Sequence, residues 1–397
     1  MVQPSREREL VLQCCASARS LDAPARLAVL LESGIEWNLF IRLVAQNGVV
    51  PMAGARLLAD FRSELPATVE RQLTLACEAN ALRCRYQAAS LLEILHSFTR
   101  ERIPALAIKG AVLAAIAFGD LNLRASGDLD VLVHRTDLPR AAAVLERIGY
   151  VAGSYRAEAF ASGFFPDTAL DFARDGIVLD LHWRLSPSYF QFAPDGEQIW
   201  ERAVDVEVGG RRVRTLGPDD SILFQAFHGS KHGWTKLRYV CDLGCVISAT
   251  AAHAAAADKN DPIGWDGLIE QARRTRSLTM LLLGVELAHS MLSVEVPATV
   301  LETAARDARV VSLSAYVKRR MFDLRDEGPF DDWPIALGSI DSVRGRARYL
   351  IDRILTPKLS DSELLRLPRP LYPLYYAARP VLVAIKHGRR LFYSSRA

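Results

Sequence analysis

One short stretch, from Leu106 to Val133, restricts the fold of this chain more than any other part of its 397 residues. A brief apolar run in it ends at Lys109-Gly110, and residues 111–118 then have the composition of a helix. After a polar loop, the segment Asp128–Val133 alternates as a half-buried strand does. The stretch therefore predicts a strand, a tight turn, a helix, a loop and a second strand, in that order.

Two carboxylates begin the second of these strands. Asp128 and Asp130 fall on one face of the strand, opposite Leu129 and Val131. Neighbouring carboxylates repel each other unless a cation lies between them, and hard oxygen ligands suit Mg²⁺ held together with substrate phosphates. An Asp-x-Asp pair is often only a solvated surface pair. Its place at the start of an apolar strand favours metal-assisted phosphoryl or nucleotidyl transfer, in which two cations ~3.5–4 Å apart clamp the reacting oxygens.

The turn before the helix offers a complementary site for anions. Gly110 stands at the expected N-terminus of the helix, where the helix dipole and free N–H groups attract phosphate, and Lys109 adds a positive charge. The alternative for Lys109 is a solvated side chain at a strand end. Arg124 and Ser126 lie in the loop that leads to the carboxylates, where each either contacts the nucleotide or holds the loop in shape.

A third carboxylate is expected from residues 176–185, the next segment with strand alternation. Asp180 shares one face of this segment with His182 and Arg184. A charged side chain between two leucines needs a partner, which a metal site on the neighbouring strand would supply. The alternative is a face open to water. Without metal, the three carboxylates are expected to raise at least one of their pKa values. His182 is interpreted as a supporting or substrate contact.

A second group of polar residues runs from His228 to Asp242, with five cations or histidines and one tryptophan in fifteen residues. Zinc is poorly supported, because His228 and His232 lie four residues apart without a third ligand beside them. A nucleotide or acceptor contact is preferred, in which His232 and Trp234 touch the substrate.

The flanks of this core read as helices. Helices are expected at residues 7–18, 25–45 and 67–99 before it, and a hairpin about Gly209-Gly210 is followed by further helices. The expected regions are an N-terminal helical region at 1–100, a catalytic core at 101–217, a C-terminal helical region at 218–345 and a basic tail at 346–397.

The composition limits the setting of the protein. A net charge of +3 is too small to indicate a polyanion partner, although residues 344–397 hold 12 Lys/Arg against 3 Asp/Glu. No run of 18 apolar residues predicts a membrane span, and charges throughout the first twenty residues argue against a signal peptide. The six cysteines form no Cys-x-x-Cys pair, so free thiols and a cytoplasmic location are expected.

The tail at 371–385 is apolar and ends in a basic run. This pattern predicts either a helix docked on the body or peripheral contact with an anionic surface.

At these residues the sequence resembles the uncharacterised nucleotidyltransferase family of the DNA polymerase beta-like superfamily. The matching pieces are Ile-Lys-Gly-Ala-Val-Leu at 108–113, Leu-Arg-Ala-Ser-Gly-Asp-Leu-Asp-Val-Leu-Val at 123–133, Leu-Asp-Leu-His-Trp-Arg-Leu at 179–185, and the histidine-rich stretch that ends at Asp242. The resemblance implies an α+β fold, with a small mixed β-sheet core between N-terminal and C-terminal helical regions.

The resemblance also implies residue roles. Asp128, Asp130 and Asp180 are implied as ligands of Mg²⁺, with Mn²⁺ as the alternative ion. Lys109-Gly110 stands where the superfamily usually has Gly-Gly or Gly-Ser at the triphosphate. The resemblance to nucleotidyltransferase-like toxins makes Lys236 and Asp242 candidates for further nucleotide contacts.

The function expected from the sequence is Mg²⁺-dependent transfer of a nucleoside monophosphate from a nucleoside triphosphate such as ATP, with release of pyrophosphate. The acceptor is a small molecule, a protein side chain or an RNA end. The alternative is a non-catalytic nucleotide-binding or scaffold protein that keeps the fold.

Overall fold

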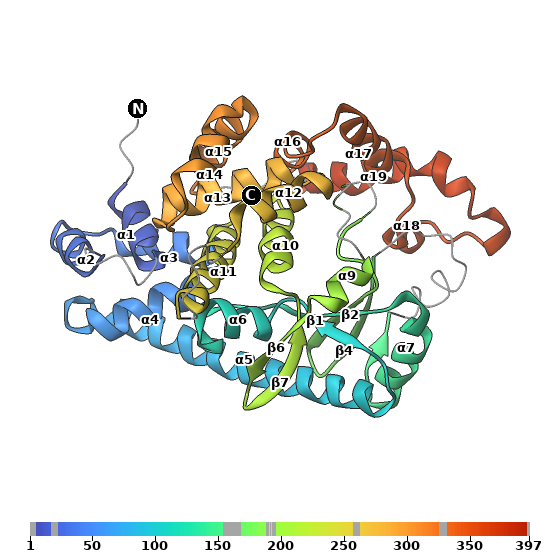
Figure 1. Cartoon of the computed structure of the whole chain (residues 1–397), viewed down its shortest axis with the longest axis horizontal. Coiled ribbons are helices and arrows are strands. Elements are labelled where there is room, and N and C mark those ends of the chain that lie inside the picture. The colour runs from blue at the N-terminus through green and yellow to red at the C-terminus, as the bar shows by residue number, and fades with distance from the viewer. Residues whose placement is uncertain are drawn as a thin grey trace.

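The computed structural model describes residues 5–16, 23–153, 168–187, 190, 192, 196–256, 263–324 and 332–394. A seven-stranded mixed sheet lies between a long N-terminal helix and a larger group of helices from the C-terminal half (Figure 1). This is the α+β arrangement expected from the sequence, with helical regions before and after the sheet.

The N-terminal region is helical as predicted. Its elements are α1 (Arg6–Cys15), α2 (Ala23–Glu32), α3 (Trp37–Gln46), α4 (Val50–Asp60), η1 (Arg62–Glu64) and α5 (Ala67–Arg100). The single helix expected at 25–45 is wrong, because the chain forms α2 and α3 there. Gly34 between them has φ +80°, and the Glu36 side chain caps α3 by accepting from the Leu39 N–H at 2.7 Å. The helix expected to reach residue 18 ends at Cys15, and residues 17 and 18 lie outside the described part.

The sheet contains the strands that the motifs predict. Its members are β1 (Ala105–Ala107), β2 (Asp128–Val133), β3 (Val151–Ala152), β4 (Ala169–Arg174), β5 (Ile177–His182), β6 (Val204–Val208) and β7 (Arg211–Thr215), in the order β3-β4-β5-β2-β1-β7-β6. The pairs β2/β5 and β1/β7 are parallel, and the remaining neighbours are antiparallel. The hairpin about Gly209-Gly210 is confirmed as β6–β7.

The two faces of the sheet pack into different apolar clusters. Alternate residues of β2, such as Leu129 and Val131, are buried in one cluster with α5, α6 (Ala111–Phe118) and α7 (Leu138–Arg147). Leu132, from the opposite face of β2, packs into a second cluster, which includes residues of the helices in the C-terminal half of the chain. Because side chains alternate along a strand, Asp128 and Asp130 face the same side as Leu132. The fold thus directs the carboxylates toward the helices of the C-terminal half of the chain.

The C-terminal half is helical apart from the β6–β7 hairpin. Its helices are α9 (Gly196–Glu201), α10 (Pro218–Lys231), α11 (Leu237–Ala256), α12 (Trp265–Arg274), α13 (Leu278–Leu292), α14 (Ala298–Arg306), α15 (Ala308–Arg320), α16 (Trp333–Gly338), α17 (Val343–Leu355), α18 (Leu359–Leu364) and α19 (Leu374–Ser394). Short 3₁₀ turns occur at η2 (Leu121–Leu123), η3 (Arg135–Asp137) and η5 (Arg369–Leu371). Helix α10 is buried along nearly its whole length, and it packs on α11 and α13.

Candidate active site

The site is built on a row of carboxylates across three adjacent strands. Asp130 on β2 pairs in register with Asp180 on β5, and Asp180 pairs in register with Asp171 on β4. Residues directly opposite each other in neighbouring strands share a face of the sheet. The strand alternation that suggested Asp180 as a third carboxylate therefore places it beside Asp130. Asp171 completes the row and was not predicted, although Leu170 and Phe172 on either side of it give the same strand alternation.

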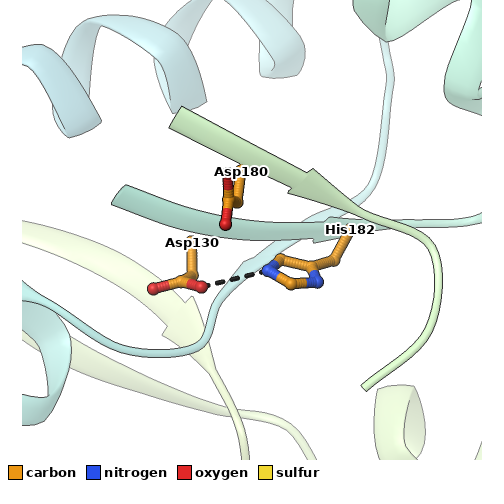
Figure 2. Close-up of side chains that lie close together, drawn as sticks. All are labelled: Asp130, Asp180 and His182. Carbon is orange, nitrogen blue, oxygen red and sulfur yellow. Dashed lines mark hydrogen bonds and ion pairs between the residues drawn. The ribbon is translucent and has the colours of Figure 1, made fainter. Parts of the chain in front are cut away.

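Asp130 is the centre of this group. Its side chain is 2% exposed, and its Oδ1 accepts from Lys109 Nζ at 2.8 Å and lies 3.0 Å from His182 Nε2. Figure 2 shows Asp130, Asp180 and the His182 ring converging from the two strands. Burial alone would raise the pKa of Asp130, but the Lys109 ammonium and the His182 imidazole hold it well below its usual range.

Asp180 has the opposite electrostatic environment. Burial raises its pKa, and the negative charges of Asp130 and Asp128 raise it further, although His182 acts in the other direction. The prediction that crowding raises at least one carboxylate pKa thus applies to Asp180 and not to Asp130. The two adjacent carboxylates differ because Lys109 and His182 bond only to the Asp130 oxygen among the described contacts.

The donor atoms fit a bound cation. Asp130, Asp180 and His182 each offer one ligand atom, and these three atoms all lie within 4.8 Å of one another. Within the described part of the chain, the buried Asp130 Oδ2 and His182 Nδ1 have no hydrogen-bond partner. A carboxylate oxygen left without a donor in a buried site is an acceptor available to a metal ion. Asp128, a predicted ligand, lies two residues before Asp130 on the same strand face but is outside this three-atom group.

The turn predicted at Gly110 is present beside the carboxylates. Gly110 lies between β1 and α6 with φ +60° and ψ −124°, a conformation that favours glycine strongly. A Cβ placed on Gly110 would lie 3.5 Å from both Ser126 Oγ and the Asp128 carbonyl oxygen. Ser126 Oγ also donates to that carbonyl at 3.0 Å, so the start of α6 and the start of β2 are in contact. Lys109, expected at a phosphate, is bonded to Asp130 here.

The loop before β2 is attached to α5, the helix expected at residues 67–99. Three side chains on one face of α5 donate to alternate backbone oxygens of this loop. The contacts are Asn80 Nδ2 to Asn122 O at 2.7 Å, Cys84 Sγ to Arg124 O at 3.5 Å, and Gln87 Nε2 to Ser126 O at 3.2 Å. Their spacing along α5 is the helical i, i+4, i+7 pattern. We call these the α5 contacts.

Arg124 and Asp242, both predicted at the nucleotide, bond to each other. The Arg124 guanidinium donates to both oxygens of Asp242, at 2.8 and 3.0 Å, and the side chains are 10% and 2% exposed. Burial would lower the pKa of Arg124, but Asp242 more than compensates and the pKa is raised. The pair ties the loop before β2 to α11, in agreement with the alternative that Arg124 holds the loop in shape.

The end of α10 adds a cation that sequence reasoning missed. The pKa of Lys231 is lowered to about 8, chiefly by burial and also by the charge of Lys109, while Asp130 and Asp180 oppose the shift. The charges of Lys109 and of these two carboxylates thus all act on the Lys231 ammonium. The signal for it was present, because Lys231 belongs to the dense polar run that begins at His228.

The other residues of that run differ in their positions. The ring of His232 stacks on Tyr239 with centroids 5.4 Å apart, and burial lowers the pKa of His232 to about 3. Lys236 is half-buried just before α11, and its charge contributes to the low pKa of His232.

Trp234, predicted as a substrate contact, is fully buried in the apolar core. Its ring fills the space above Gly229 and Gly284, where an added Cβ would come within 2.5 and 3.0 Å of ring carbons. The structure therefore places Trp234 between α10 and α13 and not on the wall of the site.

A cavity of about 510 Å³ opens at the ends of β2 and β5. Leu132, which lines it, is the register partner of His182, so the cavity adjoins the group formed by Asp130, Asp180 and His182. The residues that line it include Trp183, Trp200, Arg135 and Arg184.

Comparison with known proteins assigns the chain to a family. The chain matches the sequence model of the uncharacterised nucleotidyltransferase family over residues 33–293, and it belongs to that family. Nucleotide transfer is the reaction class that the family name gives. Among solved structures, the chain is similar to the antibiotic-resistance factor ANT(2'')-Ia at 15% identity, with a TM-score of 0.30, over 59% of this chain and 98% of that one. The comparison with curated proteins gives no match.

Proposed function

We propose that this protein transfers a nucleoside monophosphate from a nucleoside triphosphate to an acceptor hydroxyl or phosphate, with Mg²⁺ or Mn²⁺ as the cofactor. The observation that carries the proposal is the convergence of Asp130, Asp180 and His182 next to the Lys109-Gly110 turn. Asp130 and Asp180 would hold the metal, with Asp128 beside them. The bound cation would neutralise charge on the triphosphate and on the departing pyrophosphate.

Asp130 and Asp180 would have different roles in the proposed reaction. The acceptor oxygen attacks the α-phosphorus, the bond between the α-phosphorus and the bridging oxygen breaks, and pyrophosphate leaves with the bond electrons. The proton of an acceptor hydroxyl would pass to Asp180, because Lys109 and His182 already occupy the Asp130 oxygen and bond to no Asp180 oxygen among the described contacts. Asp130 keeps its charge throughout, because Lys109 and His182 stabilise the carboxylate form.

The donor triphosphate would bind at the N-terminus of α6. Backbone N–H groups at a helix start attract phosphate, and Gly110 allows a phosphate to approach the backbone closely. Lys109 and Lys231 supply positive charge from two different elements. The acceptor would enter from the cavity beyond Leu132, where indole and guanidinium groups suit a planar or anionic molecule.

A label-transfer experiment tests the function. The protein is incubated with Mg²⁺ and each of the four α-³²P-labelled ribonucleoside triphosphates, together with small-molecule, protein or RNA fractions of a cell extract. We expect pyrophosphate release and label in one of the three fractions, both abolished by EDTA. The exposed Asp205→Asn on β6 is the matched control and should transfer normally. A protein that binds triphosphate but transfers no label to any fraction would be the scaffold alternative.

The pKa of Lys231 makes nucleotide binding depend on pH. The lysine binds triphosphate when protonated and loses its charge as pH rises through about 8. We expect the Kd of a non-hydrolysable triphosphate analogue to rise on the order of tenfold between pH 7.5 and 9.5, and calorimetry measures it. Lys231→Arg keeps its charge over this range and should bind with little pH dependence. An equal pH dependence in both proteins would place Lys231 away from the triphosphate.

A further inference from the structure

The exposed apolar side chains of this protein are concentrated at its C-terminal end. Ten of the eighteen large hydrophobic residues exposed in the described part of the chain belong to residues 343–385, and eight are spread over everything before. The ten are Val343, Ile351, Ile354, Leu355, Leu364, Leu371, Leu374, Tyr376, Val381 and Ile385. Single exposed hydrophobic residues are ordinary, but this density in one short segment marks an interaction surface. We call α17, α18 and α19 the C-terminal helices.

Helix α19 has one docked side and one free side. Tyr375, Arg379 and Leu382 are buried at helical spacing, and Arg379 forms a buried ion pair with Asp361 of α18. The Tyr375 hydroxyl donates to the Leu365 carbonyl at 2.5 Å. Helix α19 therefore docks on α17 and α18, as the first alternative for the tail predicts, and it still exposes an apolar surface. Contact with an anionic surface stays a prediction.

The exposed side is apolar from Leu374 to Ile385. Leu374 and Val381 are 52% and 60% exposed and lie seven residues apart, with exposed Ala377 between them and Ile385 one turn further. Residues spaced by three, four and seven fall on one side of a helix. On α17, exposed Arg344 and Arg348 lie among exposed aliphatic side chains.

Charge is segregated in the same part of the chain. Residues 344–397 contain 12 Lys/Arg and 3 Asp/Glu, which leaves 37 Lys/Arg and 43 Asp/Glu in residues 1–343. The body is thus acidic and the C-terminal segment strongly basic. A second copy of this surface is a poor partner, because two strongly basic segments repel each other. Nucleic-acid interfaces are polar, whereas this surface is rich in aliphatic groups.

We propose that the C-terminal helices dock the protein on an anionic phospholipid bilayer. Exposed aliphatic groups would enter the region between headgroups and acyl chains, while arginines bind the lipid phosphates. Neither signal alone gives stable attachment, and this segment supplies both. In the described part of the chain, no helix is long and apolar enough to span a bilayer, so the contact is with one leaflet.

Vesicle sedimentation of the full-length protein tests the proposal. Vesicles of 30% phosphatidylglycerol in phosphatidylcholine should pellet the protein, whereas pure phosphatidylcholine or 0.5 M salt should release most of it. Leu374→Glu with Val381→Glu should weaken partitioning on the order of tenfold, because two apolar groups are lost. Arg344→Glu with Arg348→Glu should weaken it by about the same factor.

Matched controls lie on α5. Leu82, 67% exposed, and the neighbouring exposed Arg83 offer the same chemistry away from the proposed surface. Leu82→Glu and Arg83→Glu should partition as the wild type does. The proposal is overturned if the wild type stays in the supernatant, or if the α5 variants lose binding as much as the C-terminal ones. It is also overturned if the C-terminal variants instead abolish a dimer seen by light scattering or retention of RNA on a filter. Since Asp130→Asn should bind vesicles normally, the result does not depend on the proposed reaction.

Discussion

Asp130→Asn is expected to reduce nucleotide transfer on the order of a thousandfold, a loss of about 4 kcal/mol of transition-state stabilisation. The substitution keeps the size of the side chain but removes the charge on which Lys109, His182 and the proposed metal converge. Pyrophosphate release at saturating triphosphate and Mg²⁺ measures the effect. A variant that retains near-normal transfer would show that the carboxylate row is not the reaction centre.

Stability separates the roles of the two carboxylates. Asp130→Asn should unfold at a lower temperature than the wild type in EDTA, because it leaves the half-buried Lys109 ammonium without its anion. Asp180→Asn should unfold at a higher temperature near neutral pH, because burial and neighbouring charges raise the pKa of Asp180 and make its ionised form unfavourable. Both variants should be inactive, so activity loss with opposite stability changes would exclude simple misfolding.

The sign of the pH dependence follows from the two pKa shifts. A depressed pKa at Asp130 adds stability above the unfolded-state pKa, and this contribution is lost as pH falls through the folded-state value. A raised pKa at Asp180 costs stability above the unfolded-state pKa and costs nothing below it. The advantage of Asp180→Asn over the wild type should therefore disappear below about pH 4. Thermal unfolding in EDTA across this range measures it.

Arg124→Ala is expected to lower the free energy of unfolding by about 3–5 kcal/mol. The change leaves Asp242, which is 2% exposed, as a buried charge without its guanidinium partner. Urea unfolding followed by tryptophan fluorescence measures the loss. The matched control is Arg306→Ala, whose pair with Glu302 is exposed and should be worth less than about 1 kcal/mol.

A double variant distinguishes a structural pair from a nucleotide contact. Arg124→Met with Asp242→Leu removes both charges and should recover most of the stability. If the pair positions the loop before β2, transfer should fall through kcat while the Kd of the triphosphate changes little. A triphosphate Kd that rises by the same factor as transfer falls would return Arg124 to the predicted nucleotide contacts. An Arg124→Ala protein as stable as the wild type would contradict the buried pair itself.

Local patterns predicted the central segment well because its signals are local. The turn at Gly110 and the alternation from Asp128 each depend on a few adjacent residues, and the structure places β1, α6 and β2 as expected. The break at Gly34 was missed because apolar periodicity continues on both sides of it. The spacing of apolar residues indicates which side of a helix is buried, but it does not indicate where one helix ends and the chain turns into the next.

The remaining features depend on contacts between distant residues. Trp234 is in the core because Gly284, fifty residues later, leaves room for its ring. Lys231 acquires its low pKa from burial and from the charge of Lys109, more than a hundred residues earlier in the chain. Asp171 is recognised as a member of the carboxylate row only from its register with Asp180. Neither register nor packing between helices can be read from spacing in one sequence.

The α5 contacts determine which part of the chain a fragment must contain to keep the proposed site intact. A fragment that begins at residue 101 would contain every proposed metal ligand and both lysines, yet the oxygens of Asn122, Arg124 and Ser126 would lose their donors. The loop that precedes β2 and positions Asp128 and Asp130 would then be free to adopt other conformations. The smallest piece expected to carry out the proposed reaction therefore includes α5 from Asn80 onward. A change at Gln87, on a helix that contributes no proposed ligand, is expected to alter the proposed reaction through this loop.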